Sequence, residues 1–193
     1  MKVLLINGSR KDNGCTFTAL NIIAEALKEG GIDSQIFNVG SRIFKGEIEA
    51  VVKEAAELIK TCDGLVVGSP VYYASPSGEV VSFLDRFFGI AEADLRYKPA
   101  CAISTCRRAG NTACLDVLNK YFTYSQMPVV SSRYWNEVHG STPEQVLQDA
   151  EGIQIMKILA KNLTWLIKSI EAGKKSGIEQ PKFEEKIFTN FIR

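Results

Sequence analysis

The chain carries almost no net charge and only one histidine. Its 193 residues include 23 basic and 22 acidic side chains, which gives a formal net charge of +1. A protein that binds nucleic acid through its charge needs a basic excess or a basic patch. No cluster of Lys and Arg with interleaved aromatic residues occurs here. We therefore expect no nucleic-acid partner.

Long apolar runs are also absent. No stretch of about 18 apolar residues occurs, so we expect no membrane-spanning helix and no membrane partner. The first apolar run is short and becomes polar by Asn7, so we expect no secretory signal and a cytoplasmic location. A composition of 46% hydrophobic and 23% charged residues is that of one globular domain of ordinary size.

The cysteines show no spacing typical of a metal site. There are five, an odd number, and no CxxC pair occurs among Cys15, Cys62, Cys101, Cys106 and Cys114. This pattern argues against a disulfide framework and against a zinc or iron–sulfur site, so we predict no metal ligands. Two arginines follow Cys106 and could lower the pKa of its thiol, although an inert buried thiol is the simpler alternative.

Apolar runs and helical periods alternate along the chain. Continuous apolar or alternating runs predict five strands, and spacings of three and four residues predict helices between them. Strands joined by helical crossovers form a parallel sheet with helices on both faces. The sequence therefore predicts an α/β three-layer sandwich. The strands are expected at 2–7, 34–39, 64–68, 100–105 and 127–132, and the helices at 16–30, 48–59, 79–88 and 113–124.

The last third of the chain carries a helix-start signal. Thr142 is an expected N-cap, with Pro143 in the first turn and Gln145 three residues on. We expect one helix from there to about residue 171, bent near Gly152. Residues 173–193 then predict a connector and a short amphipathic helix over 183–192, packed on the domain of residues 1–172 or on a partner subunit.

The helix at 79–88 is apolar over more than one face. One face is expected to pack on the sheet. The other predicts contact with a partner subunit, or burial within one subunit as the alternative.

The most informative segment is residues 8–16, GSRKDNGCT, between the first strand and the first helix. Free N–H groups at a helix start, together with the helix dipole, favour a phosphate. A triphosphate loop would need a Lys where Cys15 stands, and a dinucleotide fingerprint would need a glycine in place of Arg10. The loop thus indicates a mononucleotide phosphate held without a metal. A polar turn that binds nothing is the alternative.

Three more segments are expected at the carboxyl edge of the sheet, where open α/β sheets bind ligands. Residues 69–78 carry two prolines and two adjacent tyrosines, and such a loop suits a flat heterocycle. The alternative is that the tyrosines pack on the end of the sheet. Residues 104–112 carry two arginines, whose positive charge would stabilise a reduced flavin at its pyrimidine edge. The alternative is that both arginines are solvated. Residues 133–140 hold Tyr134, Trp135 and His139. Together these loops fit flavin mononucleotide, FMN.

Three motifs give the chain its resemblance to the NADPH-dependent FMN reductase-like flavoproteins, over most of residues 1–171. The stretches GSRKDNGCT, SPVYYASPSGEVVSFLDR and STCRRAG resemble that family's GSPRKxGxT, SPVYxxxxS…LDR and STxRRAG motifs. The resemblance implies a flavodoxin-like fold, with five parallel strands in the order 2-1-3-4-5.

The same resemblance implies which residues bind FMN. Arg10 stands where the family has Pro, so either Arg10 or Lys11 could face the phosphate. The residues implied for the phosphate are Ser9, Arg10, Lys11, Asn13, Cys15 and Thr16, those for the ribityl chain and the isoalloxazine ring are Pro70, Val71, Tyr72 and Tyr73, and those for the far side of the ring are Thr105, Arg107 and Gly110.

The resemblance also implies a function. Members of the family use NAD(P)H to reduce FMN, which then reduces quinones, azo dyes, metals or other acceptors. They are usually homodimers or homotetramers with the flavin near a subunit interface. Because the flavin supplies the chemistry, we expect no protein group to be strictly required for catalysis. Tyr72, Arg107 and His139 are candidates for steering or protonation.

Two alternative functions are considered, and one cofactor is not expected. A flavodoxin-type electron carrier is disfavoured by the net charge of +1, since flavodoxins are typically strongly acidic. A flavin-binding sensor without turnover stays open. Related iron–sulfur flavoproteins carry a compact cysteine cluster before the second helix, and residues 40–46 contain no cysteine. We therefore expect no iron–sulfur cluster.

Overall fold

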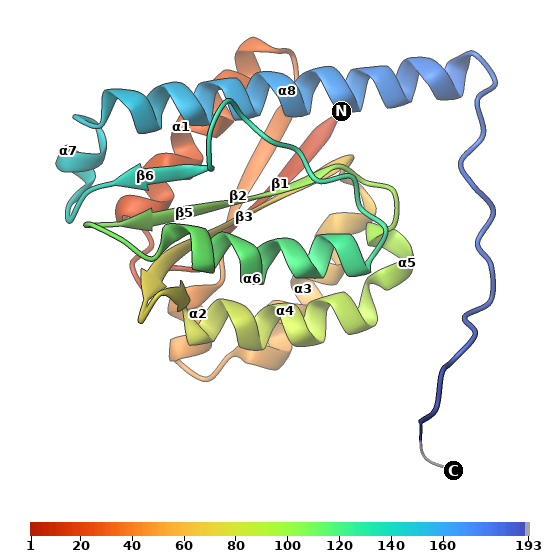
Figure 1. Cartoon of the computed structure of the whole chain (residues 1–193), viewed down its shortest axis with the longest axis horizontal. Coiled ribbons are helices and arrows are strands. Elements are labelled where there is room, and N and C mark those ends of the chain that lie inside the picture. Colours follow the sequence, from red (N-terminus) through yellow and green to blue (C-terminus); the bar gives the residue numbers. More distant parts are fainter. Residues whose placement is uncertain (192–193) are drawn as a thin grey trace.

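A parallel sheet forms the middle layer of the protein in a computed structural model that describes residues 1–191 (Figure 1). The strands run in the order β2-β1-β3-β5-β6, and the short β4 pairs antiparallel with the end of β3. The order of the five parallel strands is therefore the predicted one. The strands are β1 (Lys2–Asn7), β2 (Asp33–Asn38), β3 (Gly64–Tyr72), β4 (Ser75–Pro76), β5 (Ala100–Cys106) and β6 (Glu137–His139).

Helices cover both faces of the sheet (Figure 1). In β1, Val3 and Leu5 pack against α1 (Cys15–Glu29) and α8 (Ala150–Lys175). The alternate residues Leu4 and Ile6 pack against α3 (Ile48–Lys60), α4 (Gly78–Ile90) and α6 (Asn111–Tyr124). This two-residue alternation between two buried faces explains why the strand reads as a continuous apolar run.

Three short helices connect these elements. They are α2 (Gly40–Phe44), α5 (Glu92–Leu95) and α7 (Pro143–Val146). Among the helices of residues 1–191, none combines the length and the apolar character that crossing a membrane requires.

Most of the large apolar side chains of α4 are covered within the chain, whereas Ile90 is 60% exposed. Phe83 and Phe87 are fully buried and stack on each other, with ring centroids 5.0 Å apart. They belong to the core that α4 shares with α3 and α6. These two side chains are therefore buried within one subunit, which was the alternative to contact with a partner subunit.

The predicted fifth strand at 127–132 is wrong. Only Val129 forms a bridge there, to Ala100, and the edge strand is β6, at 137–139. Between them the side chain of Asn136 donates a hydrogen bond to the carbonyl of Ala102 (3.1 Å). The Ala102 carbonyl thus accepts from a side chain and not from the backbone of an edge strand. No apolar pattern in the sequence indicates this contact.

The predicted helix from 142 to 171 is broken rather than bent. Thr142 caps α7, as expected, by accepting a bond from Gln145 N. Asp149 then caps α8, because its Oδ1 accepts from Gly152 N (2.9 Å) while Oδ2 accepts from His139 N (2.7 Å). The second bond ties the start of α8 to the end of β6.

The predicted helix at 183–192 is also wrong as far as residue 191, since residues 178–191 form neither helix nor strand, and residue 192 lies outside the described residues. A helix this short is stable only when one face packs on something. Phe188 and Phe191 are exposed here. The helix α8 itself continues to Lys175, and the division into residues 1–172 and 173–193 stays a prediction.

Candidate functional site

The loops at the carboxyl edge of the sheet contact one another directly. We call them the rim loops, residues 8–14, 70–77, 107–110 and 140–142. Gly8 N donates to Gly68 O (2.8 Å), which joins the end of β1 to the middle of β3. The hydroxyls of Thr16 and Thr105 are 2.9 Å apart and hydrogen-bonded. The structure therefore brings together the segments that the sequence predicts to form one site.

Asn7 organises the first rim loop from inside. It is fully buried, and its Nδ2 donates to the carbonyls of Lys11 (3.4 Å) and Asp12 (3.3 Å). Its Oδ1 accepts from Ser9 N (3.2 Å). This role of Asn7 was not predicted from the sequence. A buried polar residue at the end of an apolar strand is the signal that could have indicated it, because such groups need partners.

The start of α1 has N–H groups that donate to no carbonyl within the helix. Gly14 is its N-cap and provides no side-chain hydrogen bond, and the first turn contains no acidic residue. The N–H groups of the first turn, at Cys15, Thr16 and Phe17, have no partner inside a helix. Together with the helix dipole they form a position suited to an anion.

Arg10 and Lys11 differ in their surroundings. The Arg10 guanidinium is 2.7 Å from Glu79 Oε1 and lies 4.5 Å from the centre of the Phe44 ring. The Arg10 side chain is therefore paired with Glu79 of α4 and stacked on Phe44 of α2. Lys11 is exposed, and its charge acts on Cys15, where it opposes the rise that burial causes in the pKa of the thiol. The cation near the start of α1 is Lys11.

The second rim loop is a tight hairpin between β3 and β4. Tyr73 and Ala74 have φ values of 51° and 56°, a left-handed conformation that costs energy in residues other than glycine. Tyr72 is exposed, and Tyr73 is fully exposed. The hairpin is anchored by Ser77, whose Oγ donates to Gly8 O (2.8 Å) and whose N donates to Ser69 Oγ (2.9 Å). Strain in an exposed aromatic turn is typical of a binding loop.

The third rim loop packs on this hairpin through Gly110. Its φ is +94°, and an added Cβ would lie 2.9 Å from both Ala74 Cα and Val71 Cγ1. Arg107 beside it is exposed. The predicted residues Val71, Tyr72, Tyr73, Arg107 and Gly110 therefore do share one region.

The arginines that follow Cys106 do not lower the pKa of its thiol. Burial raises the pKa of its thiol, and the Sγ donates to Asn111 Oδ1 (2.6 Å). The neighbouring arginines are exposed, so their charge is dispersed in solvent. The inert-thiol alternative is the one the structure supports.

Only the end of the stretch 133–140 reaches the rim. In the register of β5 with β6, His139 pairs with Cys106, and Gly140 N donates to Cys106 O. Tyr134 and Trp135 come before β6 and lie edge to face, with ring centroids 4.6 Å apart. They sit along the outer edge of the sheet, so the expectation that they lie on the rim is wrong.

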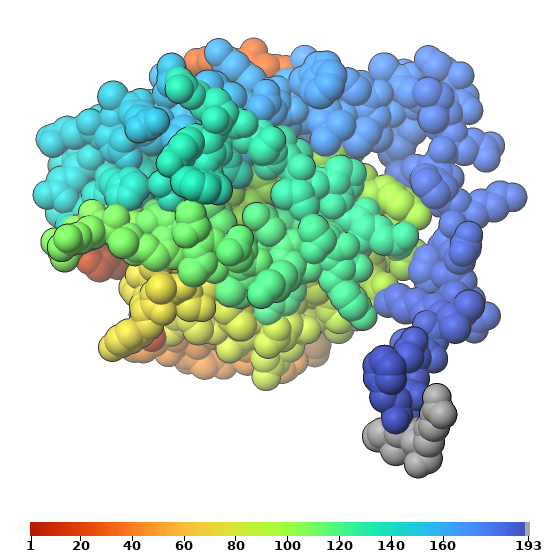
Figure 2. All heavy atoms as spheres, in the orientation of Figure 1, coloured from red at the N-terminus to blue at the C-terminus, as the bar shows by residue number. Residues whose placement is uncertain are grey.

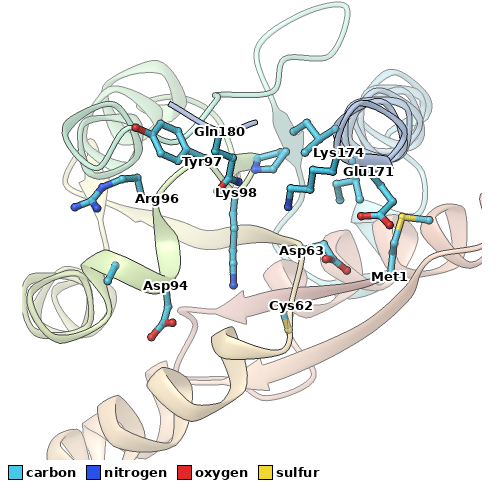
Figure 3. Close-up of a pocket in the computed structure, with 14 residues that line it drawn as sticks. Met1, Cys62, Asp63, Asp94, Arg96, Tyr97, Lys98, Glu171, Lys174 and Gln180 are labelled. Carbon is cyan, nitrogen blue, oxygen red and sulfur yellow. The ribbon is translucent and has the colours of Figure 1, made fainter. Parts of the chain in front are cut away.

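A cavity of about 260 Å³ lies at the opposite, amino edge of the sheet (Figure 3). Lys98 extends through it, and its Nζ donates to Ile59 O (2.5 Å) near the end of α3. Burial lowers the pKa of Lys98. Because this ammonium stabilises a helix C-terminus, its role is structural. The lining contains none of the predicted FMN residues.

Comparison with known proteins gives a consistent assignment. A model of the family described as NADPH-dependent FMN reductase matches residues 1–142. A protein named iron–sulfur flavoprotein from Methanocaldococcus jannaschii is 26% identical over 192 residues, which cover 89% of this chain and 100% of that protein.

Two solved structures show the same fold. RosB, solved with the bound intermediate 8-demethyl-8-formylriboflavin-5′-phosphate, has a TM-score of 0.72 and 13% identity, covering 100% of this chain and 92% of that chain. A flavodoxin from the domain Archaea has a TM-score of 0.66 and 14% identity, covering 87% of this chain and 99% of that chain. The flavodoxin-like fold predicted from the motifs is confirmed.

Replacing Gly110 should damage the rim. We expect Gly110→Ala to lower the free energy of unfolding by about 1–3 kcal/mol, because the left-handed backbone is strained with a side chain and the Cβ meets the hairpin. The control is Gly89→Ala in α4, where nothing lies within 4 Å of the added atom. That change should stabilise by about 0.5–1 kcal/mol. Urea denaturation measures both, and a neutral Gly110→Ala would contradict the packing described.

Proposed function

The chain belongs to the NADPH-dependent FMN reductase family, and we propose that it is an FMN-dependent oxidoreductase. NAD(P)H is its electron donor, and a small molecule such as a quinone or a free flavin is its acceptor. The single observation that carries the proposal is the uncapped start of α1, which lies among rim loops that also present exposed aromatic and cationic side chains.

The first rim loop and α1 suit the phosphate of FMN. The first-turn N–H groups and the ammonium of Lys11 supply hydrogen bonds and charge, and the exposed Asn13 adds an amide. Ser9 Oγ accepts from Lys11 N (3.1 Å) and still has a hydroxyl proton to donate. The hydroxyl of Thr16 is engaged with Thr105, so the contribution of Thr16 is its N–H.

The other rim loops suit the heterocycle. We assign the heterocycle to the surface that Pro70, Val71, Tyr72 and Tyr73 of the hairpin form together with Thr105, Arg107 and Gly110 of the neighbouring loop, where Gly110 packs against Val71. Bound FMN would supply the hydride and electron chemistry. The chain's own residues bind and orient the ring, exclude water on the hairpin side, and place the Arg107 charge near it. A role in steering or protonation for Tyr72, Arg107 or His139 stays a prediction.

We propose FMN without an iron–sulfur cluster, although the Methanocaldococcus relative is named an iron–sulfur flavoprotein. Within residues 1–191, no group of three His, Cys, Asp or Glu side chains is placed to hold a metal ion. Cys62 lines the cavity at the amino edge, whereas Cys15 is at the carboxyl edge. Because Cys62 and Cys15 lie at opposite edges of the sheet, these two thiols cannot ligate one cluster.

Anaerobic spectroscopy tests the function. The protein is reconstituted with FMN, freed of excess cofactor, and mixed with NADPH and then, in a separate sample, with NADH. We expect retained FMN, loss of its visible absorption with at least one nucleotide, and no stoichiometric iron or sulfide. Retained FMN that neither nucleotide reduces would contradict the oxidoreductase and favour a carrier or a sensor. Failure to retain FMN would contradict the site.

The two adjacent cations provide a matched test of the phosphate site. We expect Lys11→Ala to weaken FMN binding about tenfold, because it removes a charge-assisted contact, and Arg10→Ala to weaken it much less, because Arg10 is occupied by Glu79. Fluorescence quenching at two salt concentrations measures both, and only the Lys11 effect should fall in high salt. A larger loss for Arg10→Ala would reverse the assignment.

A further inference from the structure

A chain segment without secondary structure follows α8. It leaves the far end of α8 and descends past α5 (Figure 1), and in the space-filling view it stands partly away from the body (Figure 2). We call residues 182–191 the C-terminal arm. They form neither helix nor strand, so the arm's backbone makes no regular ladder with the sheet.

Polar contacts hold the arm against the body. Lys186 Nζ lies 2.7 Å from Glu92 Oε1 in α5, and 5.4 Å from the centre of the Tyr124 ring at the end of α6. The Arg96 guanidinium lies 3.9 Å above the Phe183 ring. The Lys186 bond lowers the pKa of Glu92 and raises that of Lys186. The arm is thus positioned beside α5 and the end of α6.

The large apolar side chains of the arm remain uncovered. Ile187, Phe188 and Phe191 are 98%, 84% and 91% exposed. A single exposed apolar residue is ordinary on a protein surface. Three within five residues of one extended segment form a contact surface that its own chain does not cover.

A groove opens next to the place where the arm is anchored. Its volume is about 400 Å³. Tyr124 belongs to both features, since it lines the groove and contacts Lys186, and it is 78% exposed. The groove lies between α4 and α6 and is lined by Phe88, Val117, Lys120, Tyr121, Tyr124 and Ser125.

We propose that the C-terminal arm of each copy binds the α4–α6 groove of a second copy, which makes an arm-exchanged homodimer. In one chain the charged contacts of the arm are made, yet its apolar side chains and the adjoining groove stay uncovered. A two-fold exchange covers both at once, because each copy contributes the same arm and the same groove. The proposal does not depend on the proposed function.

Opposite charges lie at the borders of the two surfaces. The arm carries Lys182 and Lys186 as well as Glu184 and Glu185, but Lys186 is paired with Glu92 of its own chain. The two carboxylates therefore outnumber the remaining lysine of the arm, and Lys120 lines the groove. Opposite charges at the border of an apolar contact favour one register of association over others. The aromatic side chains of the arm and groove are the types that most often anchor an interface.

Photo-crosslinking tests where the arm binds. The full chain carries a benzoyl-phenylalanine in place of Phe188, and equal amounts of nitrogen-15-labelled and unlabelled protein are mixed before irradiation. We expect crosslinked peptides that join position 188 to residues 117–125 and combine labelled with unlabelled halves. Crosslinks that never mix the labels would show the arm in its own groove and overturn the proposal. Crosslinks to another surface, or none, would do the same.

Sedimentation gives a second, independent readout. The variant Phe188→Ser/Phe191→Ser should raise the dimer Kd at least about tenfold, because buried aromatic anchors carry much of an interface's affinity. The control is Trp165→Ser, which changes an aromatic in α8 that is 72% exposed, and it should leave the Kd unchanged. A full chain that is monomeric, or a dimer insensitive to the arm variant, would overturn the proposal.

Discussion

The close approach of Gly8 to its neighbours is the constraint on which the rest of the site depends. Its N–H donates to Gly68 O and its carbonyl accepts from Ser77 Oγ, both at 2.8 Å. An added Cβ would lie 2.8 Å from Gly68 O and from Val80 Cβ. Three segments, the end of β1, the middle of β3 and the start of α4, therefore meet without a side chain between them, which only glycine permits.

In the loops around Gly8, some polar groups are hydrogen-bonded within the protein and others are available to a ligand. Buried polar groups are normally satisfied within the protein, and here Asn7, Ser69 and Ser77 satisfy the backbone of the rim loops. Because Gly14 offers no cap, the N–H groups at the start of α1 are outside that network. The loop is consequently ordered by its interior and open toward an anion at its tip.

The sequence predicts the parts of this protein that depend on local pattern. The strands β1, β3 and β5 are apolar runs, and the rim loops follow motifs, so both were predictable. The pairing of Arg10 with Glu79 was not, since these residues are 69 positions apart. Neither was the break before α8, because the Asp149 cap also depends on a bond to His139 N. The predicted C-terminal helix failed because amphipathic spacing does not show whether any surface is available for packing.

Comparing the affinities of FMN and riboflavin tests the central claim most directly, since the two differ only in the phosphate. If the rim loops form a phosphate site at the start of α1, calorimetry should show FMN binding at least about 100-fold more tightly than riboflavin, because several charge-assisted hydrogen bonds are lost together. Equal affinities would contradict the account, because the phosphate would then make no contact with the loop that the rest of the fold holds in place.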